Sequence, residues 1–210
     1  MILGITPARG GSRGLKRKNI RECAGKPLLV WTIDAAEKSK MLGHYIVSTE
    51  DAEIAEVAQL NGAVVHPRPS ALAESKANRW DVLKYHLKQF PDVTALVLLQ
   101  ATSPVRHDGL IDECINKFLA GGYDSYVTGY YDHGIPYPDN QGLNRQILGN
   151  KFFDDGNVYI WKREVIEAHE KQHPGKQWGY KITSREENID INNEFDLWIA
   201  ERVLNANISL

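Results

Sequence analysis

Short apolar runs alternate with longer amphipathic segments along most of the chain. Short apolar runs favour buried strands, whereas apolar positions that recur every third or fourth residue favour helices. This alternation predicts an α/β fold with right-handed crossovers. The predicted strands lie at residues 2–6, 45–49, 64–65, 95–99, 125–129, 157–161 and 179–182, and the predicted helices at 27–39, 51–61, 78–90, 110–120, 163–171 and 194–204.

The most apolar run, at residues 95–99, reads Ala-Leu-Val-Leu-Leu and has predicted helices on both sides. A strand without a polar face is typical of a parallel sheet that helices cover on both faces. We therefore expect this run to be a central strand of a doubly wound, mainly parallel sheet.

Between residues 130 and 155 the pattern breaks down. The segment is rich in Gly, Pro, Asn and Asp and shows no strong period. It is long for a loop without regular structure inside a compact domain. We therefore expect residues 1–210 to form one domain, in which residues 130–155 are an active-site flap or an arm that packs on another subunit.

Composition and charge narrow the class of protein. The chain has 42% hydrophobic and 25% charged residues and a formal net charge of −2. This balance argues against general binding to nucleic acid or to an anionic membrane, although it leaves room for a local basic patch. No stretch approaches the roughly 18 apolar residues of a membrane span. Because Cys23 and Cys114 lack metal-ligand spacing, we expect reduced thiols in a soluble, cytoplasmic protein.

Residues 7–20, directly after the first predicted strand, carry the strongest functional signal. Gly10, Gly11 and Gly14 let a ligand approach the main chain, and exposed N–H groups in such a loop bind anions. The Walker and dinucleotide-binding spacings are absent. The position after a strand predicts a phosphate-binding loop at the carboxyl edge of the sheet, and a solvated basic loop is the alternative. The cations of this region are Arg9, Arg13, Lys16, Arg17, Lys18 and Arg21.

Residues 5–20 resemble the signature of the acylneuraminate cytidylyltransferases, the CMP-sialic acid synthetases and their relatives for legionaminic and pseudaminic acids. The enzymes that make CMP-Kdo are more distantly similar. Further segments resemble the family in order along the chain. They are residues 47–51 (Val-Ser-Thr-Glu-Asp), 68–69 with 72–74, 98–106 (Leu-Leu-Gln-Ala-Thr-Ser-Pro-Val-Arg), 144–146 (Asn-Arg-Gln), 156–160 (Gly-Asn-Val-Tyr-Ile) and 189–192 (Ile-Asp-Ile-Asn).

The resemblance implies a Rossmann-like fold, a homodimer with a crossing arm, and transfer of CMP from CTP to the anomeric hydroxyl of a 2-keto-3-deoxy sugar acid. Pyrophosphate is released, and Mg²⁺ is the implied cofactor. The implied catalytic residues are Arg9, Lys18 and Asp190. Those implied for the nucleotide are Ala8, Arg9, Gly10, Gly11, Ser12, Arg13, Lys18, Asn19, Arg68 and Gln100. Those implied for the acceptor are Gln100, Arg145, Gln146 and Asp155, and those for the metal are Asp190 and Asn192.

The residue types suit these roles. A glutamine amide both donates and accepts, as a base edge or a sugar hydroxyl requires, although Gln100 is also suited to cap the end of a strand. An arginine at position 145 matches a planar carboxylate. Mg²⁺ takes one or two protein carboxylates together with phosphate oxygens, and Asp190 offers one unless it only caps the following turn.

The sequence departs from the family pattern at four positions. Asn192 replaces the second acid of the metal motif, Asp155 stands where the family has asparagine, Glu74 replaces aspartate, and Ala101 replaces proline. These changes keep two alternatives open: a nucleotidyltransferase with a phosphonate or sugar-phosphate acceptor, and a non-catalytic nucleotide-binding homologue. A nucleic-acid-binding module that uses the basic loop is the third alternative, which the negative net charge opposes.

Overall fold

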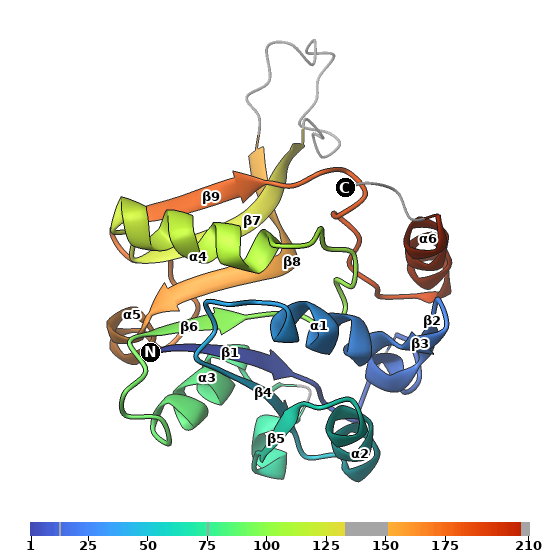
Figure 1. Ribbon diagram of the computed structural model, residues 1–210. Helices are drawn as coiled ribbons and strands as arrows, with labels where there is room; N and C mark the ends of the chain where they lie inside the picture. The colour runs from blue at the N-terminus through green and yellow to red at the C-terminus, as the bar shows by residue number, and fades with distance from the viewer. Residues whose placement is uncertain (13, 75, 133–150, 207–210) are drawn as a thin grey trace, which may run out of the picture.

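The computed structural model describes residues 1–12, 14–74, 76–132 and 151–206. In this part of the chain, seven strands form one mixed sheet in the order β5-β4-β1-β6-β8-β7-β9 (Figure 1). Their bounds are β1 Ile2–Pro7, β4 His44–Thr49, β5 Val64–Pro67, β6 Ala95–Leu98, β7 Ser125–Asp132, β8 Lys151–Lys162 and β9 Trp178–Ile182. A small antiparallel ribbon joins β2 (Glu22–Cys23) to β3 (Lys26–Pro27).

The helices are α1 Leu28–Glu37, α2 Ala52–Leu60, α3 Arg79–Leu87, α4 Leu110–Gly121, α5 Arg163–Ala168 and α6 Glu194–Asn205, with 3-10 turns η1 (Lys18–Ile20) and η2 (Ser70–Leu72). The predicted α/β fold is confirmed, with each predicted strand and helix present and α5 ending earlier than expected. At 12 residues, α4 and α6 fall short of the roughly 20 residues that a transmembrane helix needs. No helix in the described part of the chain meets the requirements of a membrane span.

The sheet is mainly parallel, as predicted, but β8 runs against both of its neighbours. β1 pairs in parallel with β4 and β6, β4 with β5, and β7 with β9, whereas β8 is antiparallel to β6 and to β7. The expected central strand therefore has one parallel and one antiparallel neighbour.

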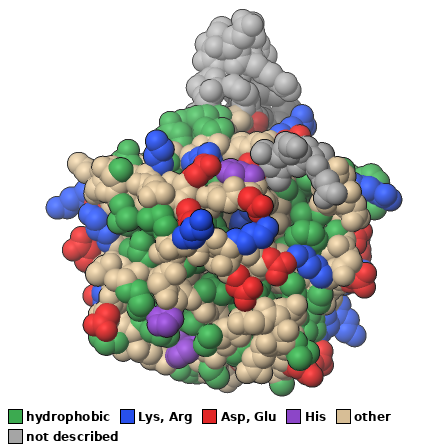
Figure 2. Space-filling model, in the orientation of Figure 1, with side chains coloured by type: hydrophobic (Ala, Val, Ile, Leu, Met, Phe, Trp, Pro, Cys, Tyr) green, Lys and Arg blue, Asp and Glu red, His purple; other side chains and the backbone are tan. Residues whose placement is uncertain are grey.

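Helices cover both faces of the sheet, which explains the unbroken apolar sequence of β6. Leu96 and Leu98 pack on one face with side chains from α3 and α5, whereas Ala95 and Val97 pack on the other face with α4. α1 and α2 lie on the same face as α4, over β4. Figure 2 shows acidic and basic side chains interspersed on the described part of the α1–α4 face, rather than basic ones gathered in one patch.

The segment at residues 130–155 is more regular at its ends than the sequence predicts. Residues 130–132 continue β7 and residues 151–155 begin β8, and the two strands pair across their length. The ladder shifts register between Val127 and Gly129, and a Cβ at Gly129 would lie 2.1 Å from the Phe153 carbonyl oxygen. The rest of the predicted arm, residues 133–150, lies outside the described residues.

Candidate active site

One cleft of about 570 Å³ opens at the carboxyl edge of the sheet, a volume in the range of small-molecule sites. The loops after β1, β5 and β6 line it, together with the segment before α6. The strand order reverses between β1 and β6, so these loops meet where open α/β sheets bind ligands. The predicted site residues that line this cleft are Arg9, Ser12, Lys18, Asn19, Arg68, Gln100 and Asn192.

Two glycines of the first loop are required by close contacts. A Cβ at Gly14 would lie 2.4 Å from the Asn192 carbonyl oxygen, and one at Gly10 would lie 2.2 Å from an Asp51 carboxylate oxygen. At Gly11, by contrast, a Cβ would meet no described atom within 4 Å. The loop thus packs against two distant segments, whereas Gly11 leaves open space for a ligand to reach the main chain.

Glu50 holds the first loop and Arg68 together. One carboxylate oxygen accepts from the Gly10 N–H at 2.8 Å, and the other accepts from the Arg68 Nε and Nη2 at 3.1 and 3.0 Å. The Arg68 side chain is only 3% exposed. Burial lowers the pKa of Arg68, and the negative charge of Glu50 opposes this shift. The described contacts of the Arg68 guanidinium are with Glu50, so Arg68 supports the loop as well as lining the cleft.

Lys18 links the first loop to the segment before α6. Its Nζ donates to the Ile191 carbonyl oxygen at 2.7 Å and lies 3.4 Å from the Asn192 Oδ1. Burial lowers the pKa of Lys18, and the nearby Asp190 charge opposes that shift. The Ile191 N–H in turn donates to the Thr102 carbonyl oxygen at 2.8 Å. Three segments far apart in sequence are therefore fixed around one half-buried cation.

The loop cations have different partners. Arg17 has a left-handed φ of 58° and pairs with Asp51 at 2.6 Å and with Glu53. Hydrogen bonding to Arg17 lowers the pKa of Asp51. Arg21 pairs with Glu194, whereas Arg9 lines the cleft. Arg17 and Arg21 therefore fasten the loop, and Arg9 and Lys18 supply charge to the cleft.

Two other predicted nucleotide residues, Ala8 and Asn19, make contacts that support the loop. Ala8 is fully buried, and its N–H donates to the Ser48 carbonyl oxygen at 2.9 Å. Asn19 lines the cleft, yet its Nδ2 donates to the Arg9 carbonyl oxygen at 2.9 Å. Arg13 lies outside the described residues, as do the predicted acceptor residues Arg145 and Gln146.

A hydrogen-bonded chain leads from the cleft toward β8. Gln100 Nε2 donates to the Tyr159 hydroxyl at 3.2 Å, and that hydroxyl donates to the Asp154 carboxylate. Burial raises the pKa of Tyr159, and its bond to Asp154 raises it further. The buried Arg106 donates to the Gln100 carbonyl oxygen at 2.8 Å, which fixes the backbone from which Gln100 projects. Burial lowers the pKa of Arg106 to about 10.

Asp155 is not brought to the cleft. Its side chain lies in the interior, where it accepts from the Thr128 and Thr183 hydroxyls, each at 2.6 Å, and from the Asn157 N–H at 2.9 Å. These bonds fix the turn at Gly156, whose φ is 82°. The neighbouring Asp154, which the sequence did not single out, is the exposed carboxylate of this turn.

The predicted metal pair lies together beside Lys18. Asn192 Nδ2 donates to an Asp190 carboxylate oxygen at 2.9 Å, and both residues are exposed. Within the described residues no group of three or more His, Cys, Asp or Glu side chains is arranged to hold a metal ion. One carboxylate next to a loop that is predicted to bind phosphate nevertheless fits Mg²⁺, which takes most of its ligands from phosphate and water.

Arg79 and Tyr159 are functional candidates that the sequence did not single out by role. Arg79 lines the cleft from the start of α3, and Tyr159 reaches it through Gln100. A cation at the first position of a helix after the Arg68 loop was the available signal for Arg79. The pairing of β6 with β8, which places Tyr159 opposite Leu98, has no local signal in sequence.

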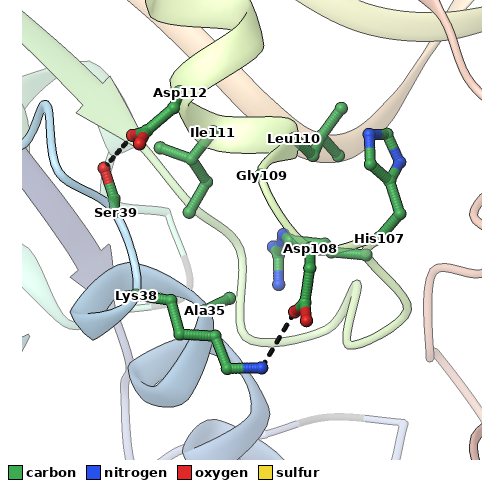
Figure 3. A pocket seen from close by; sticks show the side chains of 10 residues that line it. Ala35, Lys38, Ser39, His107, Asp108, Gly109, Leu110, Ile111 and Asp112 are labelled. Atoms are coloured by element: carbon green, nitrogen blue, oxygen red, sulfur yellow. Dashed lines mark hydrogen bonds and ion pairs between the residues drawn. The ribbon is translucent and has the colours of Figure 1, made fainter.

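A second hollow, between the end of α1 and the start of α4, is too small for a substrate. Figure 3 shows it with Lys38 bonded to Asp108 and Ser39 bonded to Asp112 across its rim. Its volume of about 30 Å³ is the room of a water molecule or two. This hollow is therefore not a candidate substrate site.

Comparisons with known proteins agree with this geometry. The chain is 31% identical to N-acylneuraminate cytidylyltransferase A of Danio rerio, over 96% of this chain and 50% of that protein. It is 38% identical to the N-acylneuraminate cytidylyltransferase of Escherichia coli O18:K1:H7, over 95% of this chain and 51% of that protein. The chain thus spans about half the length of these two relatives.

A solved structure shows the same fold. The structure of CMP:2-keto-3-deoxy-manno-octonic acid synthetase complexed with CTP matches with a TM-score of 0.77 at 13% identity, and the match covers 99% of both chains. The family described as cytidylyltransferase matches residues 3–194. Because that match takes in the first loop, the cleft and the segment before α6, the chain belongs to the cytidylyltransferase family.

Proposed function

We propose that the cleft transfers CMP from CTP to the anomeric hydroxyl of a 2-keto-3-deoxy sugar acid of the N-acylneuraminate type. One observation carries the proposal: a single cleft is lined by the cations Arg9 and Lys18 and by Gln100, whose amide donates to the buried Tyr159 hydroxyl. The first set suits a triphosphate, and the second suits a polyhydroxyl acceptor. The names of the Danio rerio and Escherichia coli relatives support the same reaction.

In this reaction an acceptor oxygen forms a bond to the α-phosphorus of CTP. The bond from that phosphorus to the bridging oxygen breaks, pyrophosphate leaves with the electron pair, and the hydroxyl proton is released to water. Phosphoryl-type transfer depends mainly on positioning and on stabilisation of charge at the phosphorus oxygens. Arg9 and Lys18 supply positive charge there, Ser12 adds a hydroxyl donor, and Gln100 orients the acceptor.

Mg²⁺ is part of the proposal. Asp190 would hold it, with Asn192 beside it and the remaining ligands from phosphate and water. A bound cation supplies charge neutralisation for the triphosphate. The negative charge of Asp190 also stabilises the protonated form of Lys18, so this carboxylate contributes to the local charge balance with or without the ion.

The proposal keeps Arg145 and Gln146 as candidates for the acceptor, and it gives Asp155 an internal supporting role instead of a contact with substrate. The buried bonds of Asp155 to Thr128 and Thr183 support that change. Cytoplasmic location also remains a proposal, which the two free buried cysteines, Cys23 and Cys114, support.

We also propose that the protein is a homodimer. Tyr131, Trp178 and Tyr180 are 40–45% exposed, and they join Phe152 in one ring cluster on β7, β8 and β9. Exposed aromatic patches of this kind mark protein interfaces. Sedimentation of the wild-type chain and of Tyr180→Ser tests this proposal: we expect a dimer that the substitution weakens, and a wild-type monomer would contradict it.

The function is tested by pyrophosphate release. The chain is incubated with CTP, Mg²⁺ and a panel of N-acetylneuraminic, legionaminic, pseudaminic and Kdo acids, together with a phosphonate and a sugar phosphate. We expect release with one of the acids, dependent on Mg²⁺ and lost in Arg9→Ala. Pyrophosphate release with only the phosphonate or the sugar phosphate would show that the acceptor is not a sugar acid. CTP binding without release in any mixture would favour a non-catalytic homologue.

A further inference from the structure

Arg79 is a cation in the cleft without a charged partner among the described residues. It is exposed and begins α3, with Asn78 as the N-cap whose side chain accepts from the Trp80 N–H. Its guanidinium lies 5.5 Å from the centre of the Tyr159 ring, and its Nη2 lies 3.5 Å from the Gln172 Oε1. No carboxylate of the described chain forms an ion pair with it.

Two other cations of the cleft are more firmly engaged. Arg68 is bound to Glu50, and Lys18 donates to the Ile191 carbonyl oxygen beside Asp190. Arg9 donates to the Glu74 carbonyl oxygen at 3.5 Å and, like Arg79, has no ion pair with a described residue, but it belongs to the glycine loop on the proposed phosphate side of the cleft. Arg79 is therefore the cleft cation outside that loop that has no ion pair among the described residues.

The surroundings place Arg79 on the acceptor side. Tyr159, whose ring lies beneath the guanidinium, accepts from Gln100 and donates to Asp154. Gln100 and Asp154 can donate to and accept from the hydroxyls of an acceptor. The backbone N–H groups and Lys18, which suit phosphate, belong to the glycine loop instead. A guanidinium held beside Tyr159 presents its two-pronged donor edge to a planar anion.

We propose that Arg79 binds the carboxylate of the acceptor and thereby selects a sugar acid over a neutral sugar. This assignment rests on the proposed function and adds to it the residue that reads the acid group. The cation–π contact with Tyr159 limits the motion of the guanidinium before the acceptor arrives, so less conformational entropy is lost on binding. The contact between Arg79 and the acceptor carboxylate positions the acceptor. It therefore affects the KM for the acceptor and not the affinity for CTP, which depends on the glycine loop.

The test compares the preferred sugar acid with its carboxamide analogue, which keeps the shape and loses the charge. The wild-type protein, Arg79→Gln, Arg79→Lys, Arg145→Gln and the control Lys88→Gln are assayed for pyrophosphate release. Lys88 is an exposed cation at the other end of the same helix. In Arg79→Gln we expect the KM for the acid to rise about 10- to 100-fold, because a charge-assisted hydrogen bond is lost.

The KM for CTP, the KM for the carboxamide and the thermal midpoint are expected to stay near wild-type values in Arg79→Gln. Arg79→Lys should recover part of the loss, and Lys88→Gln should behave as wild type. A merely structural role for Arg79 would raise both acceptor KM values together, and that outcome would overturn the inference.

Two further outcomes would overturn it. One is a collapse of selectivity in Arg145→Gln with none in Arg79→Gln; the other is a rise in the KM for CTP alone. If the wild-type protein releases no pyrophosphate with any acid, the proposed function fails and this inference fails with it. Normal wild-type turnover with unchanged selectivity in Arg79→Gln refutes the inference alone.

Discussion

The two walls of the cleft are built in different ways. The proposed phosphate wall is one loop of the chain, residues 7–20, which is held by long-range contacts with Glu50, Asp51 and Ile191. The proposed acceptor wall has no such loop: it consists of single side chains from the end of β6, the start of α3 and β8 that meet at Tyr159, Gln100 and Asp154 at its hydroxyl and Arg79 over its ring.

This difference separates binding of the nucleotide from choice of the acceptor. A loop that many backbone and side-chain contacts hold in place is pre-organised for one kind of ligand, which we propose is the triphosphate. A wall of individual side chains is altered by a single substitution, so acceptor choice can change without loss of the nucleotide site. Substitutions in the first wall should therefore affect CTP use, and substitutions in the second should affect acceptor use.

The largest expected effect is at the centre of the phosphate wall. Lys18→Met removes a charge from the triphosphate and the bond to the Ile191 carbonyl oxygen. We expect kcat/KM to fall about 1000-fold. Lys16→Met is the matched control, because Lys16 is an exposed cation of the same loop. Equal losses in the two variants, measured by pyrophosphate release, would show that the loop acts only through its overall charge.

The next largest effect is a loss of stability at acid pH, which we expect from His86. His86 is buried, and its Nε2 lies 2.7 Å from the Ser48 Oγ at the end of β4. Burial lowers the pKa of His86 to about 4, with smaller contributions from His66 and Arg68. Because the folded pKa lies below the unfolded value of roughly 6.5, the unfolded chain binds more protons between these two values.

The contribution of His86 to stability is therefore present above about pH 6.5 and is lost as the pH falls toward 4, by up to about 3 kcal/mol. Urea unfolding of the wild-type protein and of His86→Leu at pH 7 and pH 4.5 measures it. We expect the wild-type protein to lose more stability than the variant between these two values. Parallel losses would mean that other groups cause the acid sensitivity.

A smaller effect tests how tightly the loop is held. Gly14→Ala places a methyl group 2.4 Å from the Asn192 carbonyl oxygen, whereas Gly11→Ala places one in open space. We expect the free energy of unfolding to fall by about 2 kcal/mol in the first variant and by less than about 0.5 kcal/mol in the second. Chemical denaturation compares them, and equal stabilities would contradict the contact with the segment before α6.

The smallest effect falls on the acceptor wall. Tyr159→Phe removes the hydroxyl between Gln100 and Asp154 and keeps the ring under Arg79. We expect the acceptor KM to rise about tenfold, with the KM for CTP unchanged. Tyr123→Phe, on the α4 side of the sheet, is the control. A rise in the KM for CTP instead would mean that the two walls are not separate.

The position of the first loop was predictable because its signal is local. Glycines and cations directly after an apolar strand indicated a loop at the carboxyl edge of the sheet, and Arg9, Lys18 and Gln100, expected to lie together, line one cleft there. The sequence did not show which cations are used internally. Arg17 pairs with Asp51 and Glu53, and Arg68 pairs with Glu50, because α2 and β5 bring those partners close.

The acceptor wall was harder to predict because it depends on strand pairing. Tyr159 lies close enough to bond Gln100 because β8 pairs with β6, and no local pattern in the sequence indicates that pairing. The same turn buries Asp155 and exposes Asp154, a choice that two adjacent aspartates do not reveal in sequence. Aromatic residues at 130–131 and 152–153 extended β7 and β8 into the segment that composition marked as irregular.

The most direct measurement follows one oxygen atom. The preferred sugar acid is labelled with ¹⁸O at its anomeric hydroxyl and incubated with the protein, CTP and Mg²⁺. The masses of the products are then measured by mass spectrometry. If acceptor and triphosphate meet in this cleft as we propose, the label appears in the CMP-sugar and none appears in the pyrophosphate. Unlabelled CMP and pyrophosphate, with the labelled acid left unchanged, would show that water attacks the nucleotide and would contradict the transfer.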